Sequence, residues 1–395
     1  MHSLTGVVKH YDWGSLDAIP TLLRRSEDGT PWAEYWLGAH NAGPAMLAQE
    51  DTRLDTWLLR NPDSLGASER EAFGDRLPYL LKVLAANEPL SLQAHPSRAE
   101  AKAGFAAEEA RGVAIDDPDR NFKDDWPKPE LIVALTPFEA LSGFRKPSET
   151  LELFSALGVE DDIIRPTFGP LRFRGGAAAL AEVFLDCLTL DGTRLDILNQ
   201  VLAAAVHHTD DAGDIGRFAR LAIMLDEYHP GDPSLLAALL LNHVELAPGE
   251  ALHNRAGVIH SYLRGTGIEI MANSDNVLRA GLTNKHVDHA ALATIVDFSP
   301  EIPIVLSPEP DGIAAWRYPT DDMEFELWRL QISPDIQAPL PGIGRARLAL
   351  VIEGQMSLHT SQTMELLQGD AVFIGADESP TMTGDGTAFL AGPGV

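Results

Sequence analysis

The fold class is decided by the stretch LALVIEGQ at residues 348–355, a short β-prone apolar run that meets the turn residues Gly354 and Gln355. The stretch LQGDAVFI at residues 367–374 repeats the pattern, with a glycine turn before a second apolar run. Short strands separated by glycine turns are typical of a β-sandwich or jelly roll. We therefore expect such a sandwich at the C-terminal end of the chain.

The same sequence pattern appears at the N-terminal end, where short β-prone runs alternate with turn signals from Met1 to about Arg145. Between about Pro147 and Leu241 the pattern changes, because alanine and leucine recur there at helical spacing. We expect a mainly β protein with a helical insert. The expected units are a β-domain formed by residues 1–146 and 242–300, a helical domain over 147–241 and a C-terminal β-domain over 301–395.

The charge balance limits the partners of the protein. The chain has 58 acidic and 30 basic residues, which gives a formal net charge of -28. Such a charge repels phosphate backbones, so we expect neither nucleic acid nor an anionic membrane as a partner. A small anionic substrate requires basic side chains that converge locally in a cleft.

Cysteine usage and the apolar runs indicate the compartment. Cys187 is the single cysteine, so no internal disulfide can form. The first twenty residues lack the pattern of a cleaved secretory segment. The longest leucine-rich run, residues 235–241, is far shorter than the roughly 20 residues that a bilayer requires. We expect a cytoplasmic protein.

Three polar clusters could carry chemistry. Gln93 and His95 are two residues apart, so they would point to one face of a strand. Lys128 and Glu130 stand beside two prolines that hold the backbone extended just before an apolar strand. The third cluster, residues 256–285, places many different polar groups between apolar residues.

The three clusters resemble, in the same order, the signature segments of the type I mannose-6-phosphate isomerase family. YDWG at residues 11–14 and AEYWLGAH at residues 33–40 also resemble N-terminal segments of that family. The resemblance covers about residues 1–290. It implies cupin-type jelly-roll units with a helical domain. Because His359 has no second histidine two residues away, we expect the C-terminal unit to be cupin-like without a metal.

The resemblance implies one Zn²⁺ per chain, held by Gln93, His95, Glu130 and His260. Oxygen and nitrogen ligands of this kind suit zinc and leave positions for water or substrate. We expect His253, although it is close in sequence to His260, to be a loop residue or a neighbour of the ligands.

The catalytic groups that the resemblance implies are Arg279, Lys128, Glu269 and Asp275. Arg279 would support an oxyanion, and Asp275 could assist opening of the sugar ring. Lys128 and Glu269 are alternative proton-transfer bases that the sequence does not separate. The expected substrate-binding residues are Lys82, Ser91, Lys285, Tyr262 and Trp13.

The implied reaction interconverts mannose 6-phosphate and fructose 6-phosphate through a cis-enediol(ate). It moves hydrogen between adjacent carbons without net redox, so no nicotinamide is required. An isomerase of another aldose or aldose phosphate is one alternative, and a non-catalytic sugar-binding cupin is another. The sequence leaves the oligomeric state open.

Overall fold

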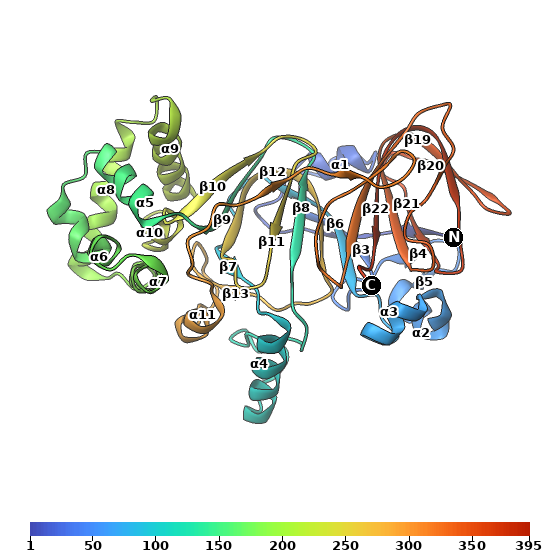
Figure 1. The fold of residues 1–395 in the computed structure, drawn as a ribbon, viewed down its shortest axis with the longest axis horizontal. Coiled ribbons are helices and arrows are strands. Elements are labelled where there is room, and N and C mark those ends of the chain that lie inside the picture. Colours follow the sequence, from blue (N-terminus) through green and yellow to red (C-terminus); the bar gives the residue numbers. More distant parts are fainter.

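The computed structural model describes residues 1–395 and is built mainly from antiparallel β-strands (Figure 1). The strands form two sheets of eleven strands each, here called the central sheet and the C-terminal sheet. Helices gather beyond one end of the central sheet, and the C-terminal sheet lies on the opposite side (Figure 1). The predicted class, mainly β with a helical insert, is confirmed. None of the helices combines the length and the apolarity that crossing a membrane requires.

The central sheet is organised around its longest strand, β12 (His260–Ala272). One half of β12 pairs with β6 (Tyr79–Ala86) and β8 (Glu130–Ala134). The other half pairs with β7 (Gln93–Ala94) and β9 (Phe138–Phe144), with a register shift between the two residues Tyr262 and Arg264. The sheet also contains β2 (Val7–Lys9), β3 (Glu34–Gly38), β10 (Leu241–Leu246), β11 (Ala251–Asn254), β13 (Leu278–Arg279) and β14 (Val305–Leu306).

The C-terminal sheet is centred on β19 (Arg347–His359) and β22 (Thr381–Gly392), which pair along most of their length. Its other C-terminal strands are β15 (Glu309–Pro310), β16 (Ala315–Arg317), β17 (Glu326–Ile332), β18 (Ala338–Pro339), β20 (Thr363–Leu367) and β21 (Ala371–Ile374). The N-terminal strands β1 (His2–Thr5), β4 (Met46–Leu47) and β5 (Thr52–Arg53) complete it. Because these early strands join the last sheet, the division into three domains stays a proposal.

The chain does not turn at Gly354, where a turn was expected. Strand β19 continues through Gly354, with a register shift against β22 between Val351 and Glu353. Gly354 has a φ of +82°, and a Cβ atom there would lie 2.0 Å from the carbonyl oxygen of Asp385. Gly354 therefore lies inside the strand, just after a bulge, where the sequence indicated the strand's end. The turn expected at Gly369 is present.

The two sheets share a core. Leu81 and Val83 of β6 belong to the same buried apolar cluster as Leu348 and Leu350 of β19, and all four side chains are fully buried. The hydroxyl of Tyr79 contacts the carbonyl oxygens of two C-terminal residues, Ala346 and Ala391, at 3.0 and 3.1 Å. This packing holds the central sheet against the C-terminal sheet.

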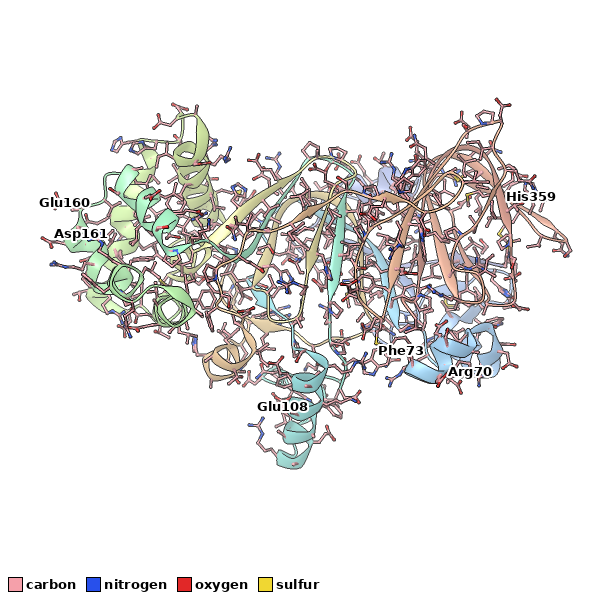
Figure 2. All side chains as sticks on the ribbon, viewed as in Figure 1. Arg70, Phe73, Glu108, Glu160, Asp161 and His359 are labelled. Carbon is pink, nitrogen blue, oxygen red and sulfur yellow. The ribbon has the colours of Figure 1, made fainter.

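The helical insert is packed on the far end of the central sheet, in the colours from green to yellow (Figure 1). Its helices are α5 (Pro147–Ala156), α6 (Asp161–Phe173), α7 (Gly176–Cys187), α8 (Asp196–Val206), α9 (Gly213–Tyr228) and α10 (Ser234–Ala238). Every residue from Leu235 to Leu241 is fully buried, so this apolar run forms the joint between the insert and the sheet. In Figure 2, His359 lies at the opposite end of the molecule from Glu160 and Asp161 of the insert.

The N-terminal region, expected as sheet, also holds helices. These are α1 (Ala18–Leu22), α2 (Leu54–Arg60), α3 (Ala67–Phe73) and α4 (Arg98–Arg111), and α11 (His289–Ile295) follows the central sheet. The start of α4 is a capping box, in which Ser97 accepts from the backbone N–H of Glu100 and the Glu100 carboxylate accepts from that of Ser97. The sequence signature of a capping box, Ser-x-x-Glu, therefore marks the start of this helix.

Candidate metal centre and active-site cleft

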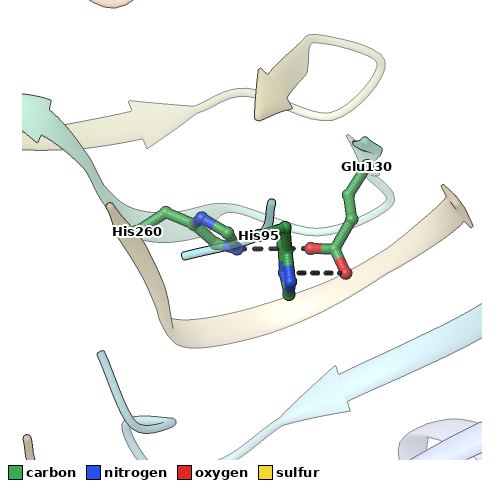
Figure 3. Close-up of side chains that lie close together, drawn as sticks. All are labelled: His95, Glu130 and His260. Carbon is green, nitrogen blue, oxygen red and sulfur yellow. Dashed lines mark hydrogen bonds and ion pairs between the residues drawn. The ribbon is translucent and has the colours of Figure 1, made fainter. Parts of the chain in front are cut away.

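Three potential metal ligands meet in the interior of the central sheet (Figure 3). His95 directly follows β7, Glu130 is the first residue of β8 and His260 is the first residue of β12. The Nε2 atoms of His95 and His260 lie 3.3 and 3.2 Å from the two carboxylate oxygens of Glu130. All three side chains are fully buried or nearly so.

The tautomers of the two histidines make this arrangement suitable for a cation. Nδ1 of His95 lies 2.7 Å from the carbonyl oxygen of Asn276, and Nδ1 of His260 lies 2.9 Å from that of Val258. A carbonyl only accepts, so each Nδ1 carries the proton and each Nε2 presents a lone pair. Two lone pairs then face an acceptor-only carboxylate, and His95 Nε2 has no hydrogen-bond partner. A metal ion is the group that all these atoms can share.

Gln93 is the fourth predicted ligand. It is the register partner of His260 across the β7–β12 pair, and it lines the adjoining cleft. An amide oxygen, two imidazole nitrogens and a carboxylate form a set that suits Zn²⁺. The four residues predicted from the sequence are thus brought together, and their roles as ligands stay a prediction.

The electrostatics keep the ligands deprotonated. Burial raises the pKa of Glu130, but the Lys128 ammonium group, 2.9 Å from its carboxylate, and the nearby His95 hold that pKa well below its usual range. Burial and the charge of Lys128 lower the pKa of His95 to about 4. At neutral pH both groups are in the form that binds a metal.

A cleft of about 500 Å³ opens beside this cluster, which is a normal volume for a small-molecule site. His95 and His260 lie behind its wall. Every other predicted site residue lines it: Trp13, Lys82, Ser91, Gln93, Lys128, Glu130, Tyr262, Glu269, Asp275, Arg279 and Lys285.

A buried ion pair forms one wall of the cleft. Lys82 of β6 and Glu269 of β12 are direct cross-strand partners, and their charged atoms are 2.8 Å apart. Glu34 of β3 lies 3.5 Å from the same ammonium group. Burial alone would lower the pKa of Lys82, but the carboxylates of Glu269 and Glu34 outweigh it and raise that pKa. Burial raises the pKa of Glu269, although Lys82 opposes the shift.

Asp275 contacts His40, which lies in the AEYWLGAH segment and was not predicted as a site residue. Nε2 of His40 lies 3.3 Å from a carboxylate oxygen of Asp275. Nδ1 of His40 accepts from the backbone N–H of Ala42, so its proton is on Nε2 and is donated to Asp275. Burial raises the pKa of Asp275, but the interaction with His40 and the charges of Lys128 and Lys82 together outweigh it and lower that pKa. Asp275 is therefore ionised at neutral pH.

The basic cleft expected from the sequence contains two kinds of cation. Lys82 and Lys128 are neutralised by buried carboxylates. Arg279 and Lys285 line the same cleft without a carboxylate partner within 4.0 Å. Burial lowers the pKa of both, and the charge of Arg279 lowers that of Lys285 further. These two side chains are the ones free to meet an anionic ligand.

Several cleft residues were not predicted as site residues. Glu34, Trp36 and His40 come from the AEYWLGAH segment, whose resemblance to the family was the available signal. Tyr228 and His229 come from the end of α9, and no local pattern distinguishes them, because only the docking of the insert brings them to the cleft. His253, placed in strand β11 rather than a loop, lies 2.7 Å from Asp322 and outside the ligand cluster.

A buried set of metal donors at the wall of a polar cleft, on a curved antiparallel sheet, defines a metal-dependent enzyme of the cupin class. The family profile described as phosphomannose isomerase type I, catalytic domain, matches residues 1–147. Mannose-6-phosphate isomerase of Salmonella typhimurium is 36% identical over 99% of this chain and 98% of its own length. The chain belongs to the type I mannose-6-phosphate isomerase family.

Other relatives and structures agree. Mannose-6-phosphate isomerase 1 of Arabidopsis thaliana is 30% identical over 94% of this chain and 88% of its own. A zinc-bound crystal structure of mannose 6-phosphate isomerase has a TM-score of 0.89 and 32% identity, covering 100% of this chain and 99% of that one. A structure bound with zinc and yttrium has a TM-score of 0.90 at 32% identity, covering 100% of both chains. The predicted cupin-type fold and family are confirmed.

Proposed function

We propose that this protein interconverts mannose 6-phosphate and fructose 6-phosphate with one Zn²⁺ per chain, held by Gln93, His95, Glu130 and His260. The observation that carries the proposal is the pair of imidazole lone pairs facing the Glu130 carboxylate at the wall of the cleft. Membership of the family supports the reaction, and zinc-bound relatives support the metal.

When bound, zinc supplies Lewis-acid stabilisation of negative charge that develops on the substrate oxygens. The side chains of this protein do the remaining work. Trp13 stacks on Tyr11 with ring centroids 5.6 Å apart, which offers an aromatic surface to a sugar ring. Burial raises the pKa of Tyr262 well above its usual value, so its hydroxyl stays protonated and can donate to a sugar oxygen.

Proton transfer between the adjacent carbons requires a base inside the cleft. Glu269 is nearly fully buried against Lys82, and Lys128 lies against Glu130. Glu269 as its carboxylate, or Lys128 as its free amine, takes the proton from one carbon and returns it to the next through the cis-enediol(ate). Arg279 donates to the oxyanion of that intermediate.

Ring opening precedes this step and needs its own proton acceptor. Asp275 is ionised and half-exposed to the cleft, so it can accept the proton of the sugar hydroxyl at the anomeric carbon. His40 fixes the carboxylate for that role by donating from Nε2. Ser91 and Lys285 bind other oxygens of the substrate.

The metal assignment is tested by replacing His95 with alanine and measuring zinc content together with isomerase activity. We expect the variant to purify with well under one zinc per chain and to lose activity by at least roughly 100-fold, because a ligand contributes more than an outer-shell partner. His253→Ala is the matched control, since this histidine pairs with Asp322 away from the cluster. A His95→Ala variant that retains stoichiometric zinc would contradict the proposed ligand set.

The alternatives are less favoured. A non-catalytic sugar-binding cupin does not require a buried base and a metal set at one cleft, and the family relatives bear enzyme names. The absence of nucleic-acid and membrane partners and the cytoplasmic location stay predictions from the charge and the apolar runs.

A further inference from the structure

A second cavity lies where the helical insert meets the central sheet, between α5, α9 and the start of β10 (Figure 1). Its volume is about 460 Å³, which is in the usual range for sites that bind small molecules. None of its lining residues also lines the active-site cleft. The proposed isomerase reaction therefore gives this cavity no role.

Arg145, the residue directly after β9, lines this cavity with a buried side chain that has one free edge. Only 9% of the residue is exposed. Its Nη1 donates to the carbonyl oxygen of Leu239 at 3.0 Å, and its guanidinium carbon lies 5.4 Å from the ring centroid of Phe218. Its Nε and Nη2 make no hydrogen bond within the protein, yet neither atom is shut off from solvent. The edge that carries these two atoms is therefore accessible.

The guanidinium group of Arg145 has no counter-charge in contact with it. No carboxylate oxygen lies within 4.0 Å, and the charges of Glu149 and Asp214 act on it only from beyond that distance. Burial lowers the pKa of Arg145 to about 10, so the side chain is still positively charged at neutral pH. Another buried arginine, Arg120, pairs with two carboxylates. Because a buried charge without a partner is costly, Arg145 calls for a negative group from outside the chain.

The free edge of Arg145 has the geometry that recognises a carboxylate. The N–H groups on Nε and Nη2 point the same way and form two parallel hydrogen bonds with the two oxygens of a carboxylate. The hydrogen bond from Nη1 to Leu239 fixes the orientation of this edge. Ile215, Phe218 and Leu221 add apolar surface to the same cavity. A carboxylate attached to an apolar group suits these surroundings.

The rim of the cavity is acidic. Glu149, Glu152 and Asp214 line it with exposed side chains. Glu149 pairs with Lys146 and Asp214 pairs with Arg217, whereas Glu152 has no basic partner within 4.0 Å. Such a rim repels a molecule that carries only negative charge and attracts an ammonium group. The charges therefore favour a ligand that carries both groups.

We propose that this cavity binds a small apolar amino acid, with its carboxylate on Nε and Nη2 of Arg145 and its ammonium group facing Glu152. The side chain of the ligand packs against Ile215 and Leu221. This inference does not rest on the proposed isomerase function, because the cavity shares no residue with the metal cluster or the active-site cleft.

The first test is calorimetric titration of the wild-type protein with leucine and two matched probes. Isocaproate is leucine without the ammonium group, and isoamylamine is leucine without the carboxylate. We expect leucine to bind saturably at one site per chain and each probe to bind at least roughly tenfold more weakly, because each loses one charged contact. No saturable binding of leucine, or binding of isoamylamine as tight as that of leucine, would overturn the inference.

The second test places the ligand at Arg145. Arg145→Lys keeps the positive charge and a donor for Leu239 but lacks the two parallel N–H groups. We expect the dissociation constant of leucine to rise at least roughly tenfold, with the urea midpoint close to that of the wild type. Arg165→Lys, at an exposed arginine of α6 that pairs with Asp162, is the matched control and should bind leucine unchanged. Equal leucine binding by Arg145→Lys and the wild type would overturn the inference.

A third variant decides the question even if Arg145→Lys does not fold. Glu152 is exposed, so Glu152→Gln removes a charge from the rim without disturbing the core. We expect this variant to bind leucine more weakly and isocaproate no more weakly than the wild type, because only leucine has an ammonium group. An unchanged ratio of the two affinities would contradict the proposed orientation of the ligand and with it the inference.

Discussion

At the scale of single residues, the metal cluster shows how the hydrogen bond of a histidine Nδ1 determines the protonation of its Nε2. Backbone carbonyls hold the Nδ1 protons of His95 and His260, and this leaves both Nε2 lone pairs for a metal. The carbonyl partner of His95 belongs to Asn276, whose side-chain amide donates to the carbonyl of Trp126 at 2.8 Å. The loop that carries Asp275 therefore also orients a proposed metal ligand.

A second residue-scale feature predicts a pH dependence of stability. Glu69 of α3 is fully buried and accepts from the backbone N–H groups of Ala346 and Gly66, while its Oε1 has no partner. Burial raises its pKa from 4.5 to about 7 in spite of these hydrogen bonds. The native state then binds this proton more tightly than the unfolded chain between pH 4.5 and 7. The contribution of Glu69 to the free energy of unfolding is largest below pH 4.5 and declines as the pH rises to 7.

We expect Glu69→Gln to be more stable than the wild type at pH 8 by about 1–3 kcal/mol and to differ little at pH 5, because glutamine cannot ionise. The measurement is the urea midpoint of both proteins at the two pH values. Glu71→Gln, exposed on the same helix, should show no such difference. Lower stability of Glu69→Gln at pH 8 would be the opposite of this expectation.

At the scale of elements, strand β12 aligns most of the site. Its first residue, His260, is the register partner of Gln93, and further along Glu269 is the partner of Lys82. One 13-residue strand therefore carries a proposed metal ligand at one end and a candidate base near the other. His260 and Glu269 are nine residues apart, so strict alternation would place them on opposite faces, and the register shift between Tyr262 and Arg264 brings both to one side.

The hydrogen bond between Ser234 of the insert and Leu282 of the loop after β13 is a second element-scale feature with a testable role. Ser234 is buried, and its hydroxyl is the partner of the Leu282 N–H. We expect Ser234→Ala to lower the free energy of unfolding by about 1–3 kcal/mol, because the N–H is left buried and unpaired. The KM for mannose 6-phosphate should rise as well. Chemical denaturation and steady-state kinetics, with the exposed Ser155→Ala as control, provide the measurement, and unchanged stability would argue against this role.

The sequence predicted elements well where the local pattern was strong. Between about Pro147 and Leu241, where alanine and leucine recur at helical spacing, the chain forms helices α5 to α10. Helix α4 was missed although its capping box is visible, and no turn forms at Gly354 because pairing with β22 continues the strand past it. Local patterns do not reveal such long-range pairing.

At the scale of the whole molecule, the site is assembled from distant segments. The N-terminal half of the chain supplies Gln93, His95 and Glu130, and the strand after the insert supplies His260. The sequence identified these residues through their resemblance to a family. It could not show that β1 joins the C-terminal sheet or that the insert brings His229 to the cleft, because both depend on how complete units pack together.

The most direct test of the account is the formation of fructose 6-phosphate from mannose 6-phosphate by the purified protein, measured before chelation, after chelation and after zinc is returned. We predict activity that is lost on chelation and restored by zinc, because the ligand set and the cleft belong to one site. Zinc-loaded protein that forms no fructose 6-phosphate would contradict the central claim.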